Sequence, residues 1–221
     1  MIYVFSNYKA IEDKIYDYEI NRLFAYPTVP TLIHDKSLYI LDSGGFAMSQ
    51  KNKKIDTNYM IELSKYYEKY NKDNVICVAP DRWLDAVESM RLYQKWNKLN
   101  LFKDITPVLQ DKKKGVVDVE YMKRQVDFYK GKSKKIMYSN NGIRGDSHMA
   151  MRVEKVCRYV KEQGFEWIHL LGAGWDLDDI KAWKSSKYID SMDSIAYYTS
   201  PKEFEANIVL EAIHNILSLF E

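Results

Sequence analysis

The chain has 221 residues, 46% of them hydrophobic, and a formal net charge of +2. Its length and composition predict one domain over residues 1–221 with a sizeable core, and its near-neutral charge neither demands nor excludes a nucleic-acid partner. No apolar run is long enough to span a bilayer, and the first residues lack the basic and long apolar regions of a signal peptide. We therefore expect a cytoplasmic protein with no membrane partner.

The two cysteines, Cys77 and Cys157, are far apart in the sequence and form no CxxC motif. A structural zinc site usually needs four Cys or His ligands, so these two residues cannot supply one. Both lie in apolar patterns, which favours buried free thiols over a disulfide. No GxxxxGK[ST] or strand-linked GxGxxG motif is present. We expect neither a metal nor a nucleotide cofactor.

Short apolar strands alternate with helix-patterned stretches along the chain. Strands are predicted at residues 2–5, 38–41, 75–79, 105–109, 135–138 and 167–171 and within 190–197, with an eighth near 28–34, where prolines interrupt the pattern. Helices are predicted at 11–23, 57–70, 85–99, 121–129, 149–163 and 177–183, and from 201 to 220. Thr57 is the expected N-cap of its helix, and Gly164 suits the position after a helix end.

Single helices between short strands predict βαβ units and a parallel sheet. Eight strands suggest a compact (β/α)8 TIM-type barrel without a zinc subdomain, and an open doubly wound sheet is the alternative. Polar residues recur where strands end, and in a barrel these ends converge on one mouth. An open sheet would spread them along an edge. The recurrence therefore favours the barrel, and the residues concerned are Asp42, Asp81, Gln110, Asn141 and Asp193.

The most informative stretch is residues 42–46, Asp-Ser-Gly-Gly-Phe, which follows a short buried strand. Paired glycines let the backbone turn sharply and approach a ligand closely, because no Cβ intervenes. The aromatic ring of Phe46 is placed to lie against a planar group. A strand end closed by an Asx-type turn is the structural alternative.

The set of strand-end motifs resembles the tRNA-guanine transglycosylases and their relatives that place 7-deazaguanines in DNA. The matching stretches are residues 42–46, 79–81 (Ala-Pro-Asp), 107–110 (Pro-Val-Leu-Gln), 141–143 (Asn-Gly-Ile), 169–174 (His-Leu-Leu-Gly-Ala-Gly) with 178–180, and 190–194 (Asp-Ser-Met-Asp-Ser). Their order and approximate spacing fit over most of residues 38–199.

This resemblance implies base exchange through a covalent sugar–enzyme intermediate. Asp193 is the implied nucleophile and Asp42 the implied general acid and base, with Asp190 as an alternative nucleophile. Asp81, Gln110 and the backbone N–H of Gly142 would recognise the guanine edge, and Phe46 and Leu171 would sandwich the ring. Ser43 and Asn141 would orient these groups, Ile143 and Gly172 belong to the same matched motifs, and His169 is interpreted as a packed strand histidine.

The sequence also departs from the tRNA enzymes of this family. They carry a Cys-rich zinc element after the nucleophile, whereas the chain after Asp193 has no cysteine and one histidine, His214. Ala47 stands where a polar residue is common. These departures favour DNA as the polymer, with lysine clusters and Arg144 as phosphate contacts. Exchange on tRNA with a partner subunit, a non-catalytic nucleic-acid-binding subunit, simple hydrolysis and a homodimer remain open.

Overall fold

The computed structural model describes residues 1–6, 20–30, 35–173, 176–194 and 218. Its strands form a nearly closed barrel in which every pairing is parallel, in the order β5-β4-β3-β2-β1-β9-β8-β7-β6. The strands are β1 (Ile2–Ser6), β2 (Arg22–Ala25), β3 (Tyr39–Asp42), β4 (Val75–Val78), β5 (Ile105–Thr106), β6 (Val108–Leu109), β7 (Lys135–Ser139), β8 (Trp167–Leu171) and β9 (Ser191–Ser194).

The two edge strands of the sheet, β5 and β6, are separated in the chain only by Pro107. Proline has no backbone N–H, so one ladder bond is lost at this residue. The carbonyl of Pro107 still accepts a hydrogen bond from the Met137 N–H of β7, at 2.9 Å, and Ala79 donates to Thr106 at 2.8 Å. The single strand predicted at 105–109 is therefore split at the proline, while its two halves pair with β4 and β7.

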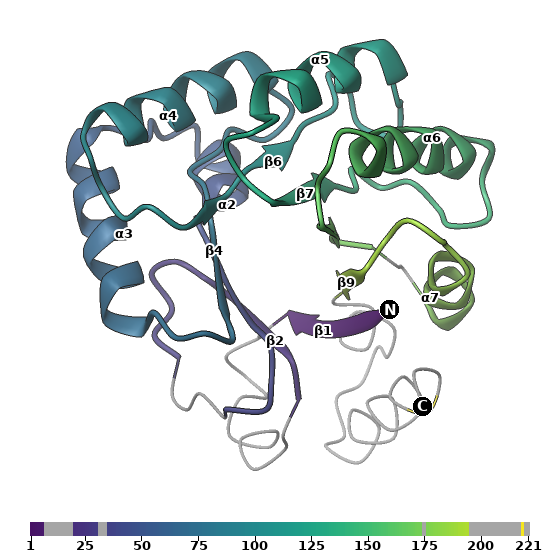
Figure 1. Ribbon diagram of the computed structural model, residues 1–221, viewed down its shortest axis with the longest axis horizontal. Helices are drawn as coiled ribbons and strands as arrows, with labels where there is room; N and C mark the ends of the chain where they lie inside the picture. Colours follow the sequence, from purple (N-terminus) through teal and green to yellow (C-terminus); the bar gives the residue numbers. More distant parts are fainter. Residues whose placement is uncertain (7–19, 31–34, 174–175, 195–217, 219–221) are drawn as a thin grey trace.

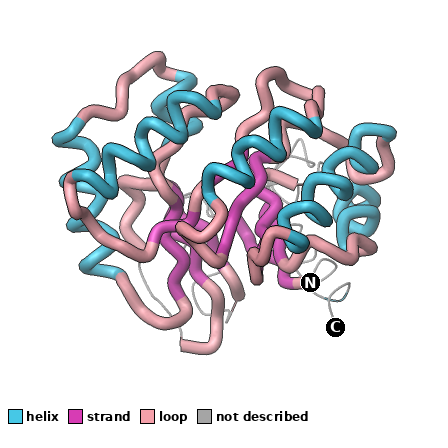
Figure 2. The backbone as a smooth tube through the Cα atoms, turned by 45° about the horizontal axis from the view of Figure 1, so that its top comes forward, coloured by secondary structure: helices cyan, strands magenta, loops and turns pink. Residues whose placement is uncertain are grey.

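The described helices form an arc around the strands (Figure 1), and Figure 2 shows the strands lying between and below them. The described helices are α2 (Gly45–Gln50), α3 (Thr57–Tyr70), α4 (Ala86–Lys98), α5 (Val119–Tyr129), α6 (His148–Glu162) and α7 (Leu177–Lys184). Each of the longer ones begins at a side-chain cap, as when Asp85 accepts from the Glu88 N–H at 2.9 Å. The predicted C-terminal glycine of α6, Gly164, has φ +90°.

Two apolar clusters follow the alternation of the strands. The larger cluster joins one face of the strands, including Leu41, Leu170 and Met192, to the buried faces of the helices. The smaller cluster contains strand residues such as Ile40, Val78 and Met137 and no buried helix residue. Because successive side chains point to opposite faces, the smaller cluster fills the barrel interior and the larger one seals the helices against its outside.

The first quarter of the chain differs from the prediction. The second strand is β2, at residues 22–25, which overlaps the end of the helix predicted at 11–23, and residues 28–30 are not a strand. The strand forms there because Leu23 and Phe24 are buried between β1 and β3, whereas the prolines at 27 and 30 lack the N–H that a ladder needs. Residues 7–19 and 31–34 lie outside the described residues, as does the predicted helix from 201.

Two local predictions also need correction. The N-cap of α3 is Asp56, not Thr57, and its carboxylate accepts from the Tyr59 N–H at 2.8 Å. The short helix α2 was not predicted, and it begins inside the Asp-Ser-Gly-Gly-Phe stretch after Gly44, whose φ of +75° suits glycine. Phe46 therefore lies in the first turn of a helix.

Candidate active site

The polar residues predicted at strand ends come together at one mouth of the barrel. Asp42 ends β3 and Asp193 lies in β9, while Asp81, Gln110 and Asn141 follow β4, β6 and β7. Since all strands are parallel, their carboxyl ends lie on the same side. Alternation places Asp42 and Asp193 on the interior side, because their neighbours Leu41 and Met192 belong to the outer cluster.

Asp193 is 5% exposed and is held by two groups from β8 and the residue after it. Its Oδ1 accepts from the backbone N–H of Gly172 at 2.9 Å and lies 3.0 Å from Nε2 of His169. The other ring nitrogen of His169 lies 2.8 Å from the Ser191 hydroxyl. A carboxylate accepts only, so Nε2 carries the proton toward Asp193 and Nδ1 accepts from Ser191. These two contacts fix the orientation of the Asp193 carboxylate.

Asp42 is the second carboxylate of the interior. Its Oδ2 accepts from the backbone N–H of Gly44 at 3.0 Å. Burial raises the pKa of Asp42 to about 6, and the negative charge of Asp193 acts in the same direction. The negative charge of Asp193 therefore disfavours ionisation of Asp42, and Asp42 can exchange a proton near neutral pH.

Asp81 lies beside this pair and is fixed by two side chains. Its Oδ1 accepts from the Ser43 hydroxyl and its Oδ2 from the Gln110 amide, each at 2.7 Å. Burial raises the pKa of Asp81 to about 7, and the charge of Asp42 adds to this. A Cβ on Gly45 would lie 2.3 Å from Oδ1 of Asp81, so the second glycine of the motif is what lets α2 approach this carboxylate.

Gln110 is anchored at both its backbone and its side chain. Its backbone N–H donates to Gln125 at 2.9 Å, and its carbonyl accepts from the same amide at 2.9 Å. The side-chain oxygen of Gln110 accepts from the Leu84 N–H at 3.2 Å. The amide of Gln110 is thus oriented with its NH2 group toward Asp81.

Residues 141–143 are held by hydrogen bonds and packing within the chain. Asn141 accepts from the Trp83 indole at 2.6 Å and donates to Asp111 at 3.3 Å. The N–H of Gly142 donates to the Asn140 carbonyl, and the Ile143 side chain is buried in the outer cluster. The Gly142 N–H thus already has a hydrogen-bond partner within the chain. The Asn141 side chain connects Trp83 to Asp111.

Two residues predicted to sandwich a ring lie at different depths. Phe46 is 56% exposed and meets the Trp83 ring edge to face, with centroids 5.2 Å apart and planes at 82°. Leu171, at the end of β8, is half-buried and packs against the interior cluster. Phe46 and Trp83 form an aromatic rim on one side of the mouth. Such a pair of rings is suited to stacking against a nucleic-acid base.

Asp190 lies away from the mouth. It precedes β9, forms an ion pair with Lys161 of α6 at 2.6 Å and accepts from the Ile168 N–H at 2.7 Å. By alternation it faces the side opposite to Asp193. Its partners give Asp190 a structural function, and the alternative nucleophile is not at the site.

Four residues of the mouth had no assigned function in the sequence or were interpreted as packing. His169 was interpreted as a packed strand histidine, and it is fully buried but bonded to Asp193. Tyr59 donates to the Ser43 carbonyl at 2.6 Å, and Trp83 and Asp111 both contact Asn141. Burial raises the pKa of Asp111 to about 7. Of these four residues, only His169 could have been assigned to the mouth from the sequence, because alternation places it on the same strand face as Leu171.

Among the described residues, no cluster of three or more His, Cys, Asp or Glu side chains could hold a metal ion. In the same part of the chain, no helix combines the length and apolar character needed to cross a bilayer. Cys77 and Cys157 are both buried free thiols, as the sequence predicted.

Comparison with models of known protein families found no match to this chain. A search of curated proteins likewise found no significant match.

Proposed function

We propose that this protein is a transglycosylase that exchanges guanine in a polynucleotide, DNA in preference to tRNA, for a 7-deazaguanine base. We also propose that the nearly closed barrel is of the (β/α)8 type. The observation that carries the proposal is the pair of interior carboxylates, Asp42 and Asp193, with Asp193 held by donors and Asp42 given a raised pKa. Retaining chemistry at a sugar carbon uses such a pair, one as nucleophile and the other as acid and base.

The reaction divides into two displacements at the sugar C1′. In the first, an Asp193 oxygen forms a bond to C1′ while the C1′–N9 bond breaks, and the leaving guanine takes its proton from Asp42. In the second, the incoming base gives its proton to Asp42 and its nitrogen bonds to C1′, which releases Asp193. A pKa of about 6 lets Asp42 serve in both directions near neutral pH.

Asp81 is the proposed base-recognition residue. Each carboxylate oxygen has two acceptor positions, so Asp81 can accept from the guanine N1–H and 2-amino group while keeping its bonds to Ser43 and Gln110. Those two bonds fix the orientation of the carboxylate before a base arrives, which lowers the ordering cost of binding. The Phe46 ring would cover one face of the base and Leu171 the other.

The test is incorporation of labelled guanine by the pure protein into DNA and, in parallel, into tRNA. Asp193→Asn keeps the size of the side chain but removes the nucleophilic charge, and we expect it to abolish both exchange and a denaturation-resistant protein–polynucleotide adduct. Asp190→Asn is the matched control, because its ion pair with Lys161 lies away from the mouth. Exchange by Asp193→Asn at the parent rate would overturn the mechanism. Incorporation into tRNA alone would overturn the choice of polymer.

A further inference from the structure

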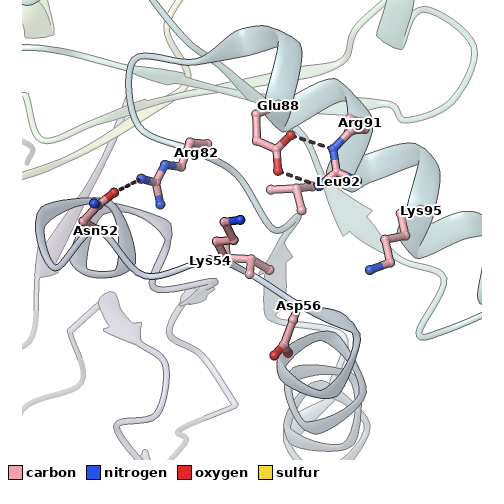
Figure 3. A pocket seen from close by; sticks show the side chains of 9 residues that line it. Asn52, Lys54, Asp56, Arg82, Glu88, Arg91, Leu92 and Lys95 are labelled. Atoms are coloured by element: carbon pink, nitrogen blue, oxygen red, sulfur yellow. Dashed lines mark hydrogen bonds and ion pairs between the residues drawn. The ribbon is translucent and has the colours of Figure 1, made fainter.

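A pocket lies between the loop that follows α2 and one face of α4 (Figure 3). It has a volume of about 610 Å³. Leu92 and Ile55 form part of its wall, but charged side chains dominate the lining. These are Lys54, Asp56, Arg82, Glu88, Arg91 and Lys95.

The charges of this pocket are unequally paired. Glu88 is bound by Arg91 through two short contacts, both 2.6 Å, and Asp56 caps α3. Lys54, Arg82 and Lys95 form no ion pair with any residue in the described part of the chain. Figure 3 shows Lys95 extending from α4 toward the loop that carries Lys54. The pocket therefore has an excess of positive charge that the described residues leave unbalanced.

The pocket is also tied to the mouth through Arg82, which directly follows Asp81. One guanidinium nitrogen of Arg82 donates to the Lys53 carbonyl at 2.6 Å, and the other lies 3.4 Å from the Asn52 amide oxygen. The next residue, Trp83, donates its backbone N–H to Ser49 of α2 at 3.1 Å and forms the rim with Phe46. The pocket and the base-recognition carboxylate thus share one continuous segment, residues 81–83.

We propose that this pocket binds a backbone phosphate of the polynucleotide, next to the nucleotide whose base enters the mouth. The inference rests on the proposed function, because it assigns the same substrate a second point of contact. A phosphodiester group would provide an anionic partner for the Lys54, Arg82 and Lys95 side chains, and both lysine and arginine bind phosphate well. Asp81 and Arg82 are consecutive in the chain, so the bound phosphate would belong to a nucleotide next to the one whose base contacts Asp81.

The test compares two double variants that remove the same charge. Lys54→Ala/Lys95→Ala removes two pocket cations, while Lys98→Ala/Lys103→Ala removes two lysines that do not line the pocket, at the end of α4 and before β5. Arg82 is left unchanged because it holds the loop. Binding of a labelled single-stranded oligonucleotide is followed by fluorescence anisotropy over a range of salt concentrations.

We expect the pocket variant to bind more weakly and to lose about 0.7 of log–log salt slope for each phosphate contact removed. The control variant should keep the parent slope. An unchanged slope in the pocket variant overturns the inference. This result is independent of catalysis, which is scored separately by guanine exchange, so an inactive parent protein would reject the proposed function while the binding comparison still decides the pocket.

A second arm separates a polynucleotide phosphate from a free one. Inorganic phosphate is titrated into the parent protein and the pocket variant by calorimetry at fixed ionic strength. Weak or absent binding of inorganic phosphate together with a lowered oligonucleotide slope supports the inference. Tight binding of inorganic phosphate that the pocket variant loses, with oligonucleotide binding unchanged, would assign the pocket to a free phosphate compound and overturn it.

Discussion

His169 is the residue whose function we expect to extend beyond packing. Its Nε2 contacts Asp193 and its Nδ1 contacts Ser191, so the ring fixes the rotamer of the proposed nucleophile. Removing the contact in His169→Leu should slow formation of the protein–sugar adduct by about 100-fold, the cost of a nucleophile misplaced by roughly 1 Å. Single-turnover adduct formation is the measurement.

The conservative variant distinguishes positioning from packing at this position. His169→Gln keeps a donor that can reach Asp193 and should recover part of the rate, whereas His169→Leu preserves an apolar side chain without any donor. Both variants should bind polynucleotide as the parent does, because the ring is fully buried. Equal rates in the two variants would show that the ring only fills space.

At the level of single residues, the sequence indicated which side chains gather at the mouth but not how they bond. Asp42 and Asp193 could be placed there because each ends or lies in a predicted strand and strand ends converge in a barrel. The bond between His169 and Asp193 depends on the register of β8 against β9, in which His169 pairs with Ser191. Register between strands separated by a helix has no local signal, so this contact could not be predicted.

The short helix α2 depends on the absence of a side chain at Gly45. A Cβ there would lie 2.3 Å from Oδ1 and 2.5 Å from the carbonyl oxygen of Asp81, closer than real contacts allow. Gly45→Ala should therefore push α2 away from the loop after β4 and weaken base binding more than tenfold. The measurement is binding of guanine or a 7-deazaguanine by calorimetry, with the free energy of unfolding determined in parallel.

A second glycine provides the control for this variant. At Gly115 a Cβ would meet nothing within 4 Å, but φ is +71°, so Gly115→Ala carries only backbone strain. That strain is expected to cost about 1 kcal/mol of stability and to leave base binding unchanged. If Gly45→Ala bound the base as tightly as Gly115→Ala, close approach of α2 to Asp81 would not matter for recognition.

Elements with a clear period were predicted well, and those set by tertiary contacts were not. The helix at residues 57–70 was found with the same bounds because its apolar residues repeat at helical spacing. The strand β2 is only four residues long and includes the buried Arg22, so its pattern carried little information. The helix α2 begins with glycine and has no side-chain cap, which explains why it was missed.

Over the whole molecule, the mouth concentrates carboxylates that burial keeps partly protonated. The pKa is raised from 3.8 to about 6 at Asp42 and to about 7 at Asp81 and Asp111. Such groups bind protons more tightly in the folded than in the unfolded chain. Their contribution to stability is therefore complete below about pH 4 and is lost as pH rises through 6 to 7. We expect the free energy of unfolding to decline over this window.

Asp111 allows this expectation to be tested without altering a proposed catalytic group. Its carboxylate contacts Tyr138 and Asn141, and it is 1% exposed. Asp111→Asn cannot ionise, so it should remove one of the three contributions and make the variant gain stability relative to the parent as pH rises from 4 to 8. A shift of about three pKa units corresponds to an upper limit of about 4 kcal/mol.

Urea unfolding at several pH values gives the difference in stability between variant and parent. Asp118→Asn is the control, because Asp118 caps a helix at an exposed position and its pKa is lowered, and this variant should show no such gain. A pH-independent difference between Asp111→Asn and the parent would mean that Asp111 titrates in the folded protein as it does in the unfolded chain.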